Sequence, residues 1–214
     1  MATIAVIDYG MGNLHSVARA LNHVAPRAQV TVTQDPQVIL GADRVVFPGQ
    51  GAMRDCMSEL QRHDLIDVIS TAARTRPFLG LCLGPQALLT HSEENGGVAG
   101  LNILPGRSLW FGHHLRSAAL ANQHLKIPHM GWNRVHQTRP HPLWTSIAQD
   151  SRFYFVHSYY LLPDEPTLTA GLTDYGFEFT SVMAKDNVFA VQFHPEKSAA
   201  AGLQLLANFS CWHP

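Results

Sequence analysis

The sequence has few of the features that mark secreted or membrane-spanning proteins. Its 214 residues include only three cysteines, Cys56, Cys82 and Cys211. Their odd number and wide spacing argue against a disulfide framework and favour a reducing, cytoplasmic location. No apolar run approaches the roughly 20 residues that span a bilayer. The first residues, 1–8, lack a basic segment and turn acidic at Asp8, so they predict a strand and not a signal peptide.

Charge is also scarce. Charged residues make up 14% of the chain, and its net charge is −1 with histidine neutral. This balance offers no basic surface for a polyanion, so nucleic acid is not expected as a partner. No Cys-x-x-Cys pair indicates zinc, and we expect neither a metal nor a cofactor. The apolar content of 46% instead predicts a well-buried globular protein, and the length fits one domain over residues 1–214.

The first half of the chain alternates short apolar runs with helical patterns. Such a rhythm predicts an α/β fold with a mostly parallel sheet and helices on both faces. The predicted strands are residues 4–8, 30–33, 44–47 and 78–81. The predicted helices are residues 14–24, 56–69 with a break near 63–64, and a helix opening at 85–91.

The second half has strand patterns with few helices between them. This indicates an antiparallel or mixed extension of the sheet, followed by a helix over residues 198–209 that docks on it. Residues 112–123 have the least regular pattern and predict a loop. The predicted strands are residues 103–110, 131–136, 153–161, 177–184 and 188–193.

Cys82 differs from the other two cysteines because glycines surround it. The segment Gly80-Leu81-Cys82-Leu83-Gly84 follows an apolar run and precedes a predicted helix, which is typical of a sharp strand-to-helix turn that exposes a nucleophile. A helix N-terminus favours the thiolate form, and the Leu83 N–H would face an oxyanion formed on a carbon bonded to sulfur. Cys56 and Cys211 lie within helical apolar patterns and are interpreted as buried hydrophobic residues.

His194 and Glu196 supply the partners that a nucleophilic thiol needs. They follow the apolar run 188–193, whose carboxyl end is where parallel-sheet enzymes place their chemistry. Residues i and i+2 of an extended chain face the same side, so the Glu196 carboxylate is expected to orient the His194 ring. The three residues are therefore a candidate Cys-His-Glu triad.

The turn Pro48-Gly49-Gln50-Gly51 ends a predicted strand beside the Cys82 strand. It is either a turn and nothing more or a source of a backbone N–H for the oxyanion. In the second case, rotation of one peptide unit would switch the site on or off.

These residues together resemble the class I, or triad, glutamine amidotransferases. Within that family the chain is similar to the glutaminase subunits of imidazole glycerol phosphate synthases, and the similarity covers nearly the whole length. The resemblance runs through Asp8–Asn13, Pro48–Gly51, Pro128–Asn133, Phe155–Tyr159 and Gln192–Ser198. Residues 10–13, 129–133 and 157–159 are the stretches that narrow it to these subunits. Gln50 stands where many members of the family carry an aliphatic residue, which bears on how the turn at Pro48–Gly51 switches. Pro85 stands where methionine is common, and neither change touches the triad.

The resemblance implies a flavodoxin-like sheet, L-glutamine as substrate, and an obligate partner in histidine biosynthesis. That partner is a (β/α)8-barrel cyclase subunit, which receives ammonia through an internal tunnel. By this resemblance Cys82 is the nucleophile, His194 the base and acid, and Glu196 the residue that orients it. The other implied roles are the oxyanion region for Gly51 and Leu83, glutamine binding for Gln86, His157, Ser158 and Tyr159, and the subunit interface for Asn13, Trp132, Tyr154 and Lys197.

Two other hypotheses remain at this stage. The chain could serve a different synthase, such as those that make anthranilate, carbamoyl phosphate or GMP, because the triad motifs identify only the superfamily. It could also be a scaffold that keeps the fold for binding without catalysis, although the intact Cys82, His194 and Glu196 argue against that.

Overall fold

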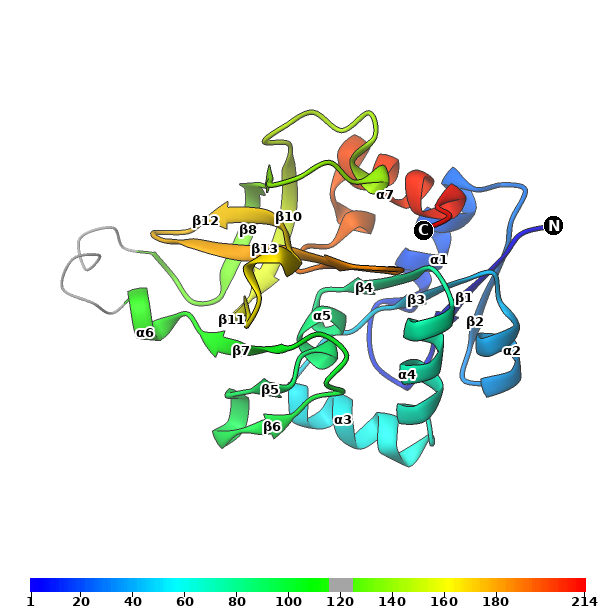
Figure 1. The fold of residues 1–214 in the computed structure, drawn as a ribbon, viewed down its shortest axis with the longest axis horizontal. Coiled ribbons are helices and arrows are strands. Elements are labelled where there is room, and N and C mark those ends of the chain that lie inside the picture. Colours follow the sequence, from blue (N-terminus) through cyan, green and yellow to red (C-terminus); the bar gives the residue numbers. More distant parts are fainter. Residues whose placement is uncertain (116–124) are drawn as a thin grey trace.

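The computed structural model describes residues 1–115 and 125–214 and confirms the predicted α/β architecture (Figure 1). Within these residues twelve strands form one sheet, in the order β2-β1-β3-β4-β14-β13-β11-β7-β5-β6, with β12 beside β13 and β9 beside β12. A separate pair, β8 and β10, forms a second small sheet.

The five strands at one end of the main sheet are parallel, as the first half of the sequence predicts. β3, β4 and β14 are buried along their whole length, because helices cover both of their faces. The carboxyl ends of β3, β4 and β14 therefore meet at one edge of the sheet. The bounds of these strands are β1 (Thr3–Ile7), β2 (Gln29–Thr33), β3 (Arg44–Phe47), β4 (Phe78–Leu81) and β14 (Val188–Val191).

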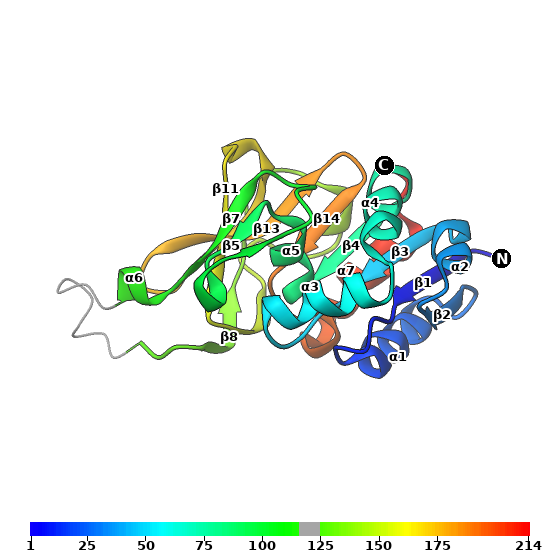
Figure 2. The same cartoon turned by 90° about the horizontal axis from the view of Figure 1, so that it is seen from below.

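Helices pack on both faces of the parallel strands. Figure 1 shows α7 above the sheet and α3, α4 and α5 below it, and Figure 2 shows the same helices and α1 as seen from below. Apolar residues of α1 and α7 join one core cluster, and those of α2 to α5 join the other. The predicted break near residues 63–64 is confirmed between α3 and α4. The helices are α1 (Leu14–Val24), α2 (Pro36–Gly41), α3 (Met53–Arg62), α4 (Ile66–Thr75), α5 (Leu83–Leu88), α6 (Gly112–Leu115) and α7 (Ala199–Cys211).

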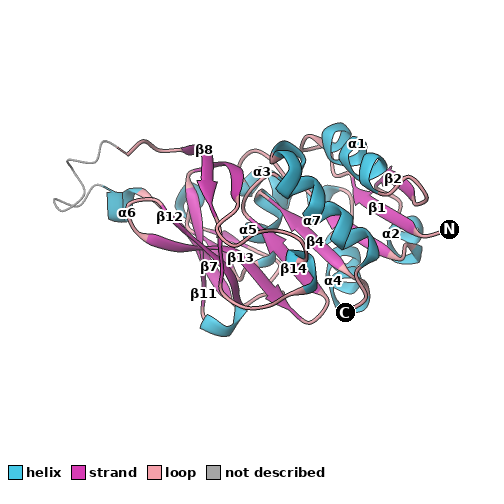
Figure 3. Ribbon diagram, turned by 90° about the horizontal axis from the view of Figure 1, so that it is seen from above, coloured by secondary structure: helices cyan, strands magenta, loops and turns pink. Residues whose placement is uncertain are grey.

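Apart from β8 and β10 of the small sheet, the remaining strands extend the main sheet, mostly antiparallel (Figure 3). Their bounds are β5 (His91–Ser92), β6 (Val98–Ala99), β7 (Gly106–Trp110), β8 (His129–Arg134), β9 (His136–Gln137), β10 (Arg152–His157), β11 (Tyr159–Pro163), β12 (Thr169–Asp174) and β13 (Glu178–Lys185). The single strand predicted over residues 153–161 is wrong. The chain breaks at Ser158, where β10 leaves the small sheet and β11 enters the main one.

Several predicted bounds also need correction. The strand predicted from residue 103 begins at Gly106, and the helix after Cys82 spans Leu83–Leu88. The loop predicted over residues 112–123 opens with the short helix α6, and its residues 116–123 lie outside the described residues. Short 3-10 turns complete the fold: η1 (Glu94–Gly96), η3 (Pro142–Trp144), η4 (Pro166–Leu168) and η5 (Pro195–Lys197).

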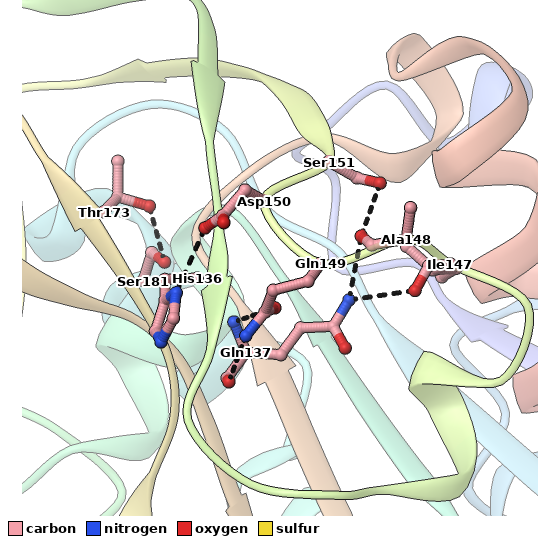
Figure 4. A network of polar contacts seen from close by, with 9 residues as sticks. All are labelled: His136, Gln137, Ile147, Ala148, Gln149, Asp150, Ser151, Thr173 and Ser181. Atoms are coloured by element: carbon pink, nitrogen blue, oxygen red, sulfur yellow. Dashed lines mark hydrogen bonds and ion pairs between the residues drawn. The ribbon is translucent and has the colours of Figure 1, made fainter.

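A polar network fixes the segment that leads into β10 (Figure 4). The Gln137 N–H donates to Gln149 Oε1 at 2.8 Å, and Gln149 Nε2 donates back to the Gln137 carbonyl at 2.9 Å. His136 pairs with Asp150 at 3.1 Å, and Ser151 Oγ donates to the Ala148 carbonyl at 2.7 Å. Residues 147–151 are thereby tied to β9, so that β10 starts from a fixed point.

The cysteines divide differently from the expectation. Cys56 is buried as predicted, but Cys211 is exposed. Cys211 follows Phe209 by two positions on α7, so it points away from the sheet that buries Phe209. Among residues 1–115 and 125–214, no helix combines the length and apolar character needed to cross a membrane.

Candidate active site

Cys82 lies between β4 and α5, on the sharp turn that the sequence predicts. Its backbone has φ 55° and ψ −93°, a left-handed conformation that a residue with a side chain seldom adopts. Two hydrogen bonds hold it there. The Cys82 N–H donates to the Val191 carbonyl at 2.9 Å, and Gln192 Nε2 donates to the Cys82 carbonyl at 2.9 Å. Both partners belong to β14 or the residue after it, so the neighbouring strand stabilises the strained turn.

Glycine allows the chain to fold this tightly. A Cβ atom added to Gly84 would lie 2.4 Å from the Phe47 carbonyl oxygen at the end of β3. No side chain fits at that distance, so only glycine lets α5 begin directly against the neighbouring strand. The sulfur of Cys82 is therefore fixed at the edge where β3, β4 and β14 end.

His194 reaches the same edge from β14. Its N–H donates to the Tyr154 carbonyl at 2.9 Å, and its carbonyl accepts from Ser198 Oγ at 2.6 Å. His194 Nδ1 lies 2.9 Å from Glu196 Oε1, with the two side chains only 3% and 2% exposed. The predicted contact is confirmed, but its predicted geometry is wrong. Glu196 turns back through the 3-10 turn η5 and not along extended backbone.

The environment of His194 favours the protonated ring. Burial alone would lower the pKa of His194, but interaction with Cys82 and Glu196 outweighs it and raises the pKa to about 10. Within the described chain, Nε2 of His194 has no hydrogen bond of good geometry, although the Cys82 thiol lies near enough to raise the pKa of the ring. Catalytic hydrogen bonds are often long in an enzyme without its substrate and shorten when substrate binds.

A cavity of about 410 Å³ opens over Cys82 and His194. It brings together most of the residues predicted for catalysis and for glutamine binding. Its lining consists of Gln50, Gly51, Cys82, Leu83, Gln86, Glu94, Pro128, Val156, His157, Ser158, Tyr159, His194 and Lys197.

The oxyanion region is occupied by a backbone carbonyl. The Leu83 N–H donates to the Gly49 carbonyl at 3.4 Å. Because the C=O and N–H of one trans peptide unit point in opposite directions, the Gln50 N–H faces away from Leu83. Gly51 lines the cavity with φ 93°. The turn at Pro48–Gly51 thus lies beside Cys82 as expected, with an acceptor turned toward the place where a second donor would be needed.

The predicted glutamine-binding residues occupy two positions around the cavity. Gln86 is 4% exposed, and its amide is already engaged, since Nε2 donates to Gln192 Oε1 at 3.1 Å and Oε1 accepts from Ser108 Oγ at 3.3 Å. His157, Ser158 and Tyr159 form the opposite wall at the β10–β11 junction. The Ser158 carbonyl accepts from the Phe111 N–H at 3.1 Å.

Two of the four predicted interface residues, Trp132 and Tyr154, contact each other, and the other two line different cavities. Trp132 is 43% exposed and meets the Tyr154 ring edge-to-face at 6.2 Å, outside the cavity. Lys197 is exposed at the cavity rim. Asn13 lines a second cavity of about 10 Å³ on another side of Cys82, together with Gly49, Gln50, His194 and Glu196 among others.

Sequence reasoning missed Glu94, whose side chain lines the large cavity. Its Oε2 accepts the Met53 N–H at 2.8 Å, at the start of α3. An acidic residue in a turn before two glycines resembles an ordinary surface charge, so the sequence carries no signal for this placement. In the described residues, no group of three or more His, Cys, Asp and Glu side chains is arranged to hold a metal ion.

Comparison with known families identifies this arrangement. The sequence matches the family described as glutamine amidotransferase class-I over residues 5–211. This chain belongs to the class I glutamine amidotransferases. The strained Cys82 turn and the His194–Glu196 pair both lie within the matched residues.

Curated relatives of this glutamine amidotransferase match it over essentially its full length. The imidazole glycerol phosphate synthase subunit HisH of Nitrosococcus oceani is 60% identical and covers 100% of this chain and 99% of its own. The HisH subunits of Methylococcus capsulatus and Pseudomonas putida are 59% and 54% identical, over 100% and 99% of this chain and 98% of theirs. At these identities the chain belongs to the HisH family.

Solved structures of other amidotransferases share the fold. PurLQS from Thermotoga maritima superposes with a TM-score of 0.72 at 14% identity and covers 97% of both chains. A glutamine amidotransferase from the same organism superposes with a TM-score of 0.59 at 14% identity, over 91% of this chain and 76% of its own. The likeness confirms the class I glutaminase fold.

Proposed function

We propose that this glutamine amidotransferase is the glutaminase subunit of an imidazole glycerol phosphate synthase in the cytoplasm. It would hydrolyse L-glutamine to glutamate and ammonia and pass the ammonia to a (β/α)8-barrel cyclase subunit. The observation that carries this proposal is the cavity of about 410 Å³, which is lined both by the strained Cys82 and by His194, the partner of the buried Glu196 carboxylate. The full-length similarity to HisH subunits supports the choice of synthase.

Catalysis would proceed through a thioester. The Cys82 thiolate attacks the side-chain amide carbon of glutamine, and the carbonyl π electrons move to oxygen. The protonated His194 ring, which Glu196 orients at 2.9 Å, gives its Nε2 proton to the departing nitrogen, so that ammonia leaves and the thioester remains. Water then attacks the thioester while His194 takes its proton, and collapse of the second intermediate releases glutamate and the thiolate.

The oxyanion would need two backbone donors. Leu83 supplies one N–H, which is now bonded to the Gly49 carbonyl. Rotation of the Gly49–Gln50 peptide unit would remove that carbonyl and turn the Gln50 N–H toward the same point beside Gly51. A donor lost from an oxyanion hole costs roughly 3–4 kcal/mol in related chemistry. The unrotated peptide would therefore keep the free protein nearly inactive, so glutamine is not hydrolysed without a partner to use the ammonia.

Glutamine recognition would combine charge with backbone contacts. Glu94 contributes a carboxylate to the cavity, the group suited to a substrate α-ammonium. Ser158 and Tyr159, which line the same cavity, offer backbone groups. The reacting amide would then lie over Cys82.

Ammonia would leave on the Asn13 side. The second cavity of about 10 Å³ touches Cys82, His194 and Asn13 and has about the volume that one small molecule needs. An enclosed exit would keep ammonia unprotonated, as a nucleophile must be. The exposed Met130 and Trp132 on β8, 61% and 43% exposed, offer apolar surface to the cyclase.

Partner-dependent turnover tests the proposal. Glutamate release from glutamine should be very slow for the free protein, and it should rise on the order of 100-fold when a barrel cyclase and its nucleotide ligand are added. An anthranilate, carbamoyl phosphate or GMP synthase partner should give no such rise. Equal turnover with and without the cyclase would contradict the coupling, and stimulation by one of the other synthases would replace the assigned partner.

A further inference from the structure

A pair of buried histidines lies behind one wall of the large cavity. His129 in β8 and His157 in β10 are opposite each other in the small sheet and are 3% and 6% exposed. His129 Nδ1 lies 2.8 Å from His157 Nε2. Catalysis as described above uses neither ring, although His157 lines the cavity.

One end of this pair fixes which nitrogen carries the proton. His157 Nδ1 lies 2.7 Å from the Tyr159 carbonyl oxygen, which can only accept, so Nδ1 carries hydrogen. Burial lowers the pKa of His157 to about 3 and that of His129 to about 4, so both rings are neutral at pH 7. Nε2 of His157 is then an acceptor, and the donor to it must be His129 Nδ1–H.

The other end leads to the same assignment independently. Asn133 Oδ1 accepts the Arg134 N–H at 2.8 Å, which leaves Nδ2 as the donor group. Nδ2 donates to the Asp174 carbonyl at 2.7 Å and to His129 Nε2 at 3.2 Å. Nε2 of His129 is therefore an acceptor and its proton is on Nδ1. The hydrogen bonds run in one direction from Asn133 through both rings to Tyr159.

Aromatic rings hold His129 in this orientation. Its ring is stacked with Phe155 at 4.9 Å and with Tyr175 at 4.1 Å. Tyr175 is fixed in turn, because its hydroxyl donates to the Lys126 carbonyl at 2.9 Å. His129 is thus packed against two aromatic rings, with both of its nitrogens hydrogen-bonded.

We propose that His129 is a positioning residue for glutamine binding, acting through His157 on the Ser158–Tyr159 segment of the cavity wall. The inference rests on the proposed glutaminase function. The chain crosses from the small sheet to the main sheet at Ser158, and the bond from His157 to the Tyr159 carbonyl bridges that crossing. If the His129 donor is lost, Nε2 of His157 becomes a buried acceptor without a partner. The His157 ring is then held through Nδ1 alone, and the Tyr159 carbonyl that it bonds is positioned less firmly.

Two substitutions separate this role from simple packing. His129→Leu keeps an apolar side chain of similar bulk but donates no hydrogen bond. His129→Asn retains an amide N–H near the position of Nδ1 and should restore the donor. In the complex with the cyclase, we expect His129→Leu to raise the glutamine KM about tenfold with kcat within about twofold, as loss of one hydrogen-bonded contact predicts. His129→Asn should recover most of that change.

Three further measurements complete the test. Alkylation of Cys82 by iodoacetamide, which needs no glutamine pocket, should keep the wild-type rate in both variants. Nitrogen-15 NMR should show the His157 proton on Nδ1 in the wild type and in both variants, with the Nε2 resonance of His157 shifted only in His129→Leu, where its donor is lost. His136→Leu, which removes an exposed histidine of β9, is the control and should leave both kinetic constants unchanged.

The outcomes distinguish failure of the positioning role of His129 from failure of the proposed glutaminase function. An unchanged KM in His129→Leu, or an equal rise in both variants, would overturn the positioning role. A wild-type proton on Nε2 of His157 would overturn it as well, and that measurement stands even if His129→Leu does not fold. Absence of glutaminase activity in the wild-type complex would instead remove the proposed function.

Discussion

Two buried histidines on the walls of one cavity have opposite charge preferences. His194 and His157 are 3% and 6% exposed, and burial by itself lowers the pKa of both. The pKa of His194 is nevertheless raised to about 10, whereas that of His157 is lowered to about 3. The difference lies in their partners. His194 meets a carboxylate and a thiol, and His157 meets a neutral imidazole and a backbone carbonyl.

Two histidines that line the same cavity are thus suited to different roles in the proposed mechanism. His194 must hold a proton that it can give to departing ammonia, and an adjacent carboxylate favours that state. His157 must keep a proton on one nitrogen and an acceptor on the other, and a charged ring would disrupt the chain of hydrogen bonds. Burial is common to both, so hydrogen-bond partners and not solvent exposure set the charge of each ring.

Removal of the thiol near His194 should have the largest effect. We expect Cys82→Ala to reduce glutamine-dependent synthesis by the complex on the order of 10³-fold or more, because no other group can form the thioester. Synthesis from added ammonium salts should be retained, since the cyclase does not need the triad. Both rates can be measured on the same preparation. Retention of the glutamine route would mean that another residue is the nucleophile.

Removal of the Glu196 carboxylate should shift the pKa of His194 in the direction of that of His157. In Glu196→Gln the His194 pKa should fall, because burial would be opposed only by Cys82 and no longer by the carboxylate. The kcat should drop on the order of 10³–10⁴-fold, as for other triads that lose the orienting carboxylate. NMR titration of His194 and steady-state kinetics measure the two effects.

The matched control is Asp150→Asn, which alters a histidine–carboxylate pair exposed to solvent. The side chains of His136 and Asp150 are 56% and 49% exposed, so solvent screens the pair. Its kinetics should be those of the wild type. A fall in kcat in Asp150→Asn comparable to that in Glu196→Gln would show that the effect does not come from the buried triad.

The same comparison explains what could be predicted from the sequence. The Cys82 turn was predictable because its signals are local: glycines, an apolar run and the start of a helix within a few residues. The His194–Glu196 contact was also local, although it forms through a turn. The His129–His157 pair was not predictable, because it depends on the register of β8 against β10 and on a strand break at Ser158.

Other residues escaped prediction for a similar physical reason. Glu94 became part of the cavity only because η1 packs beside the start of α3, where it accepts the Met53 N–H. Gln86 was predicted to bind glutamine, yet its amide is held by Gln192 and Ser108, which come from distant segments. Helical periodicity placed Leu205 and Phe209 in the core, but an apolar pattern was extended one residue too far to include Cys211.

Acid should lower the unfolding free energy of the protein through His129 and His157. Because the pKa values of His129 and His157 are lowered in the folded state, their contribution to stability is complete above about pH 6.5 and is lost as pH falls toward 4 and 3. His194 has the opposite sign. Its raised pKa contributes stability below about pH 6.5 that is lost as pH rises through about 10.

Urea unfolding at several pH values measures this difference. Between pH 7 and pH 5 the wild type should lose more unfolding free energy than His129→Asn, by about 1–2 kcal/mol, because the variant lacks one of the buried neutral histidines that must take up a proton on unfolding. Equal losses in the two proteins would mean that other groups dominate acid unfolding and that His129 is not kept neutral by the fold.

The smallest effect should come from a third buried group, which has no strong partner. The Tyr9 hydroxyl meets no nitrogen or oxygen partner within the described part of the chain, and the Cys56 thiol beside it is a weak one. The pKa of Tyr9 is raised, chiefly by burial. The hydroxyl lies against the oxyanion turn, since a Cβ atom on Gly49 would approach it to 2.5 Å. A buried polar group without a good partner costs free energy, so Tyr9→Phe should raise the unfolding free energy by about 1 kcal/mol.

Tyr160→Phe is the matched control for this change. The Tyr160 ring is also buried, but its hydroxyl pairs with His114 Nε2 at 2.9 Å. Its removal should therefore lower the unfolding free energy by about 1 kcal/mol, the opposite sign. Urea denaturation of both variants at pH 7 distinguishes the cases. A less stable Tyr9→Phe would indicate that the hydroxyl has a stronger partner, such as a bound water molecule, beneath the oxyanion turn. If Tyr9→Phe is more stable and Tyr160→Phe is less stable than the wild type, the effect of burying a hydroxyl group depends on its hydrogen-bond partner. The same dependence holds for the buried imidazoles of His194 and His157.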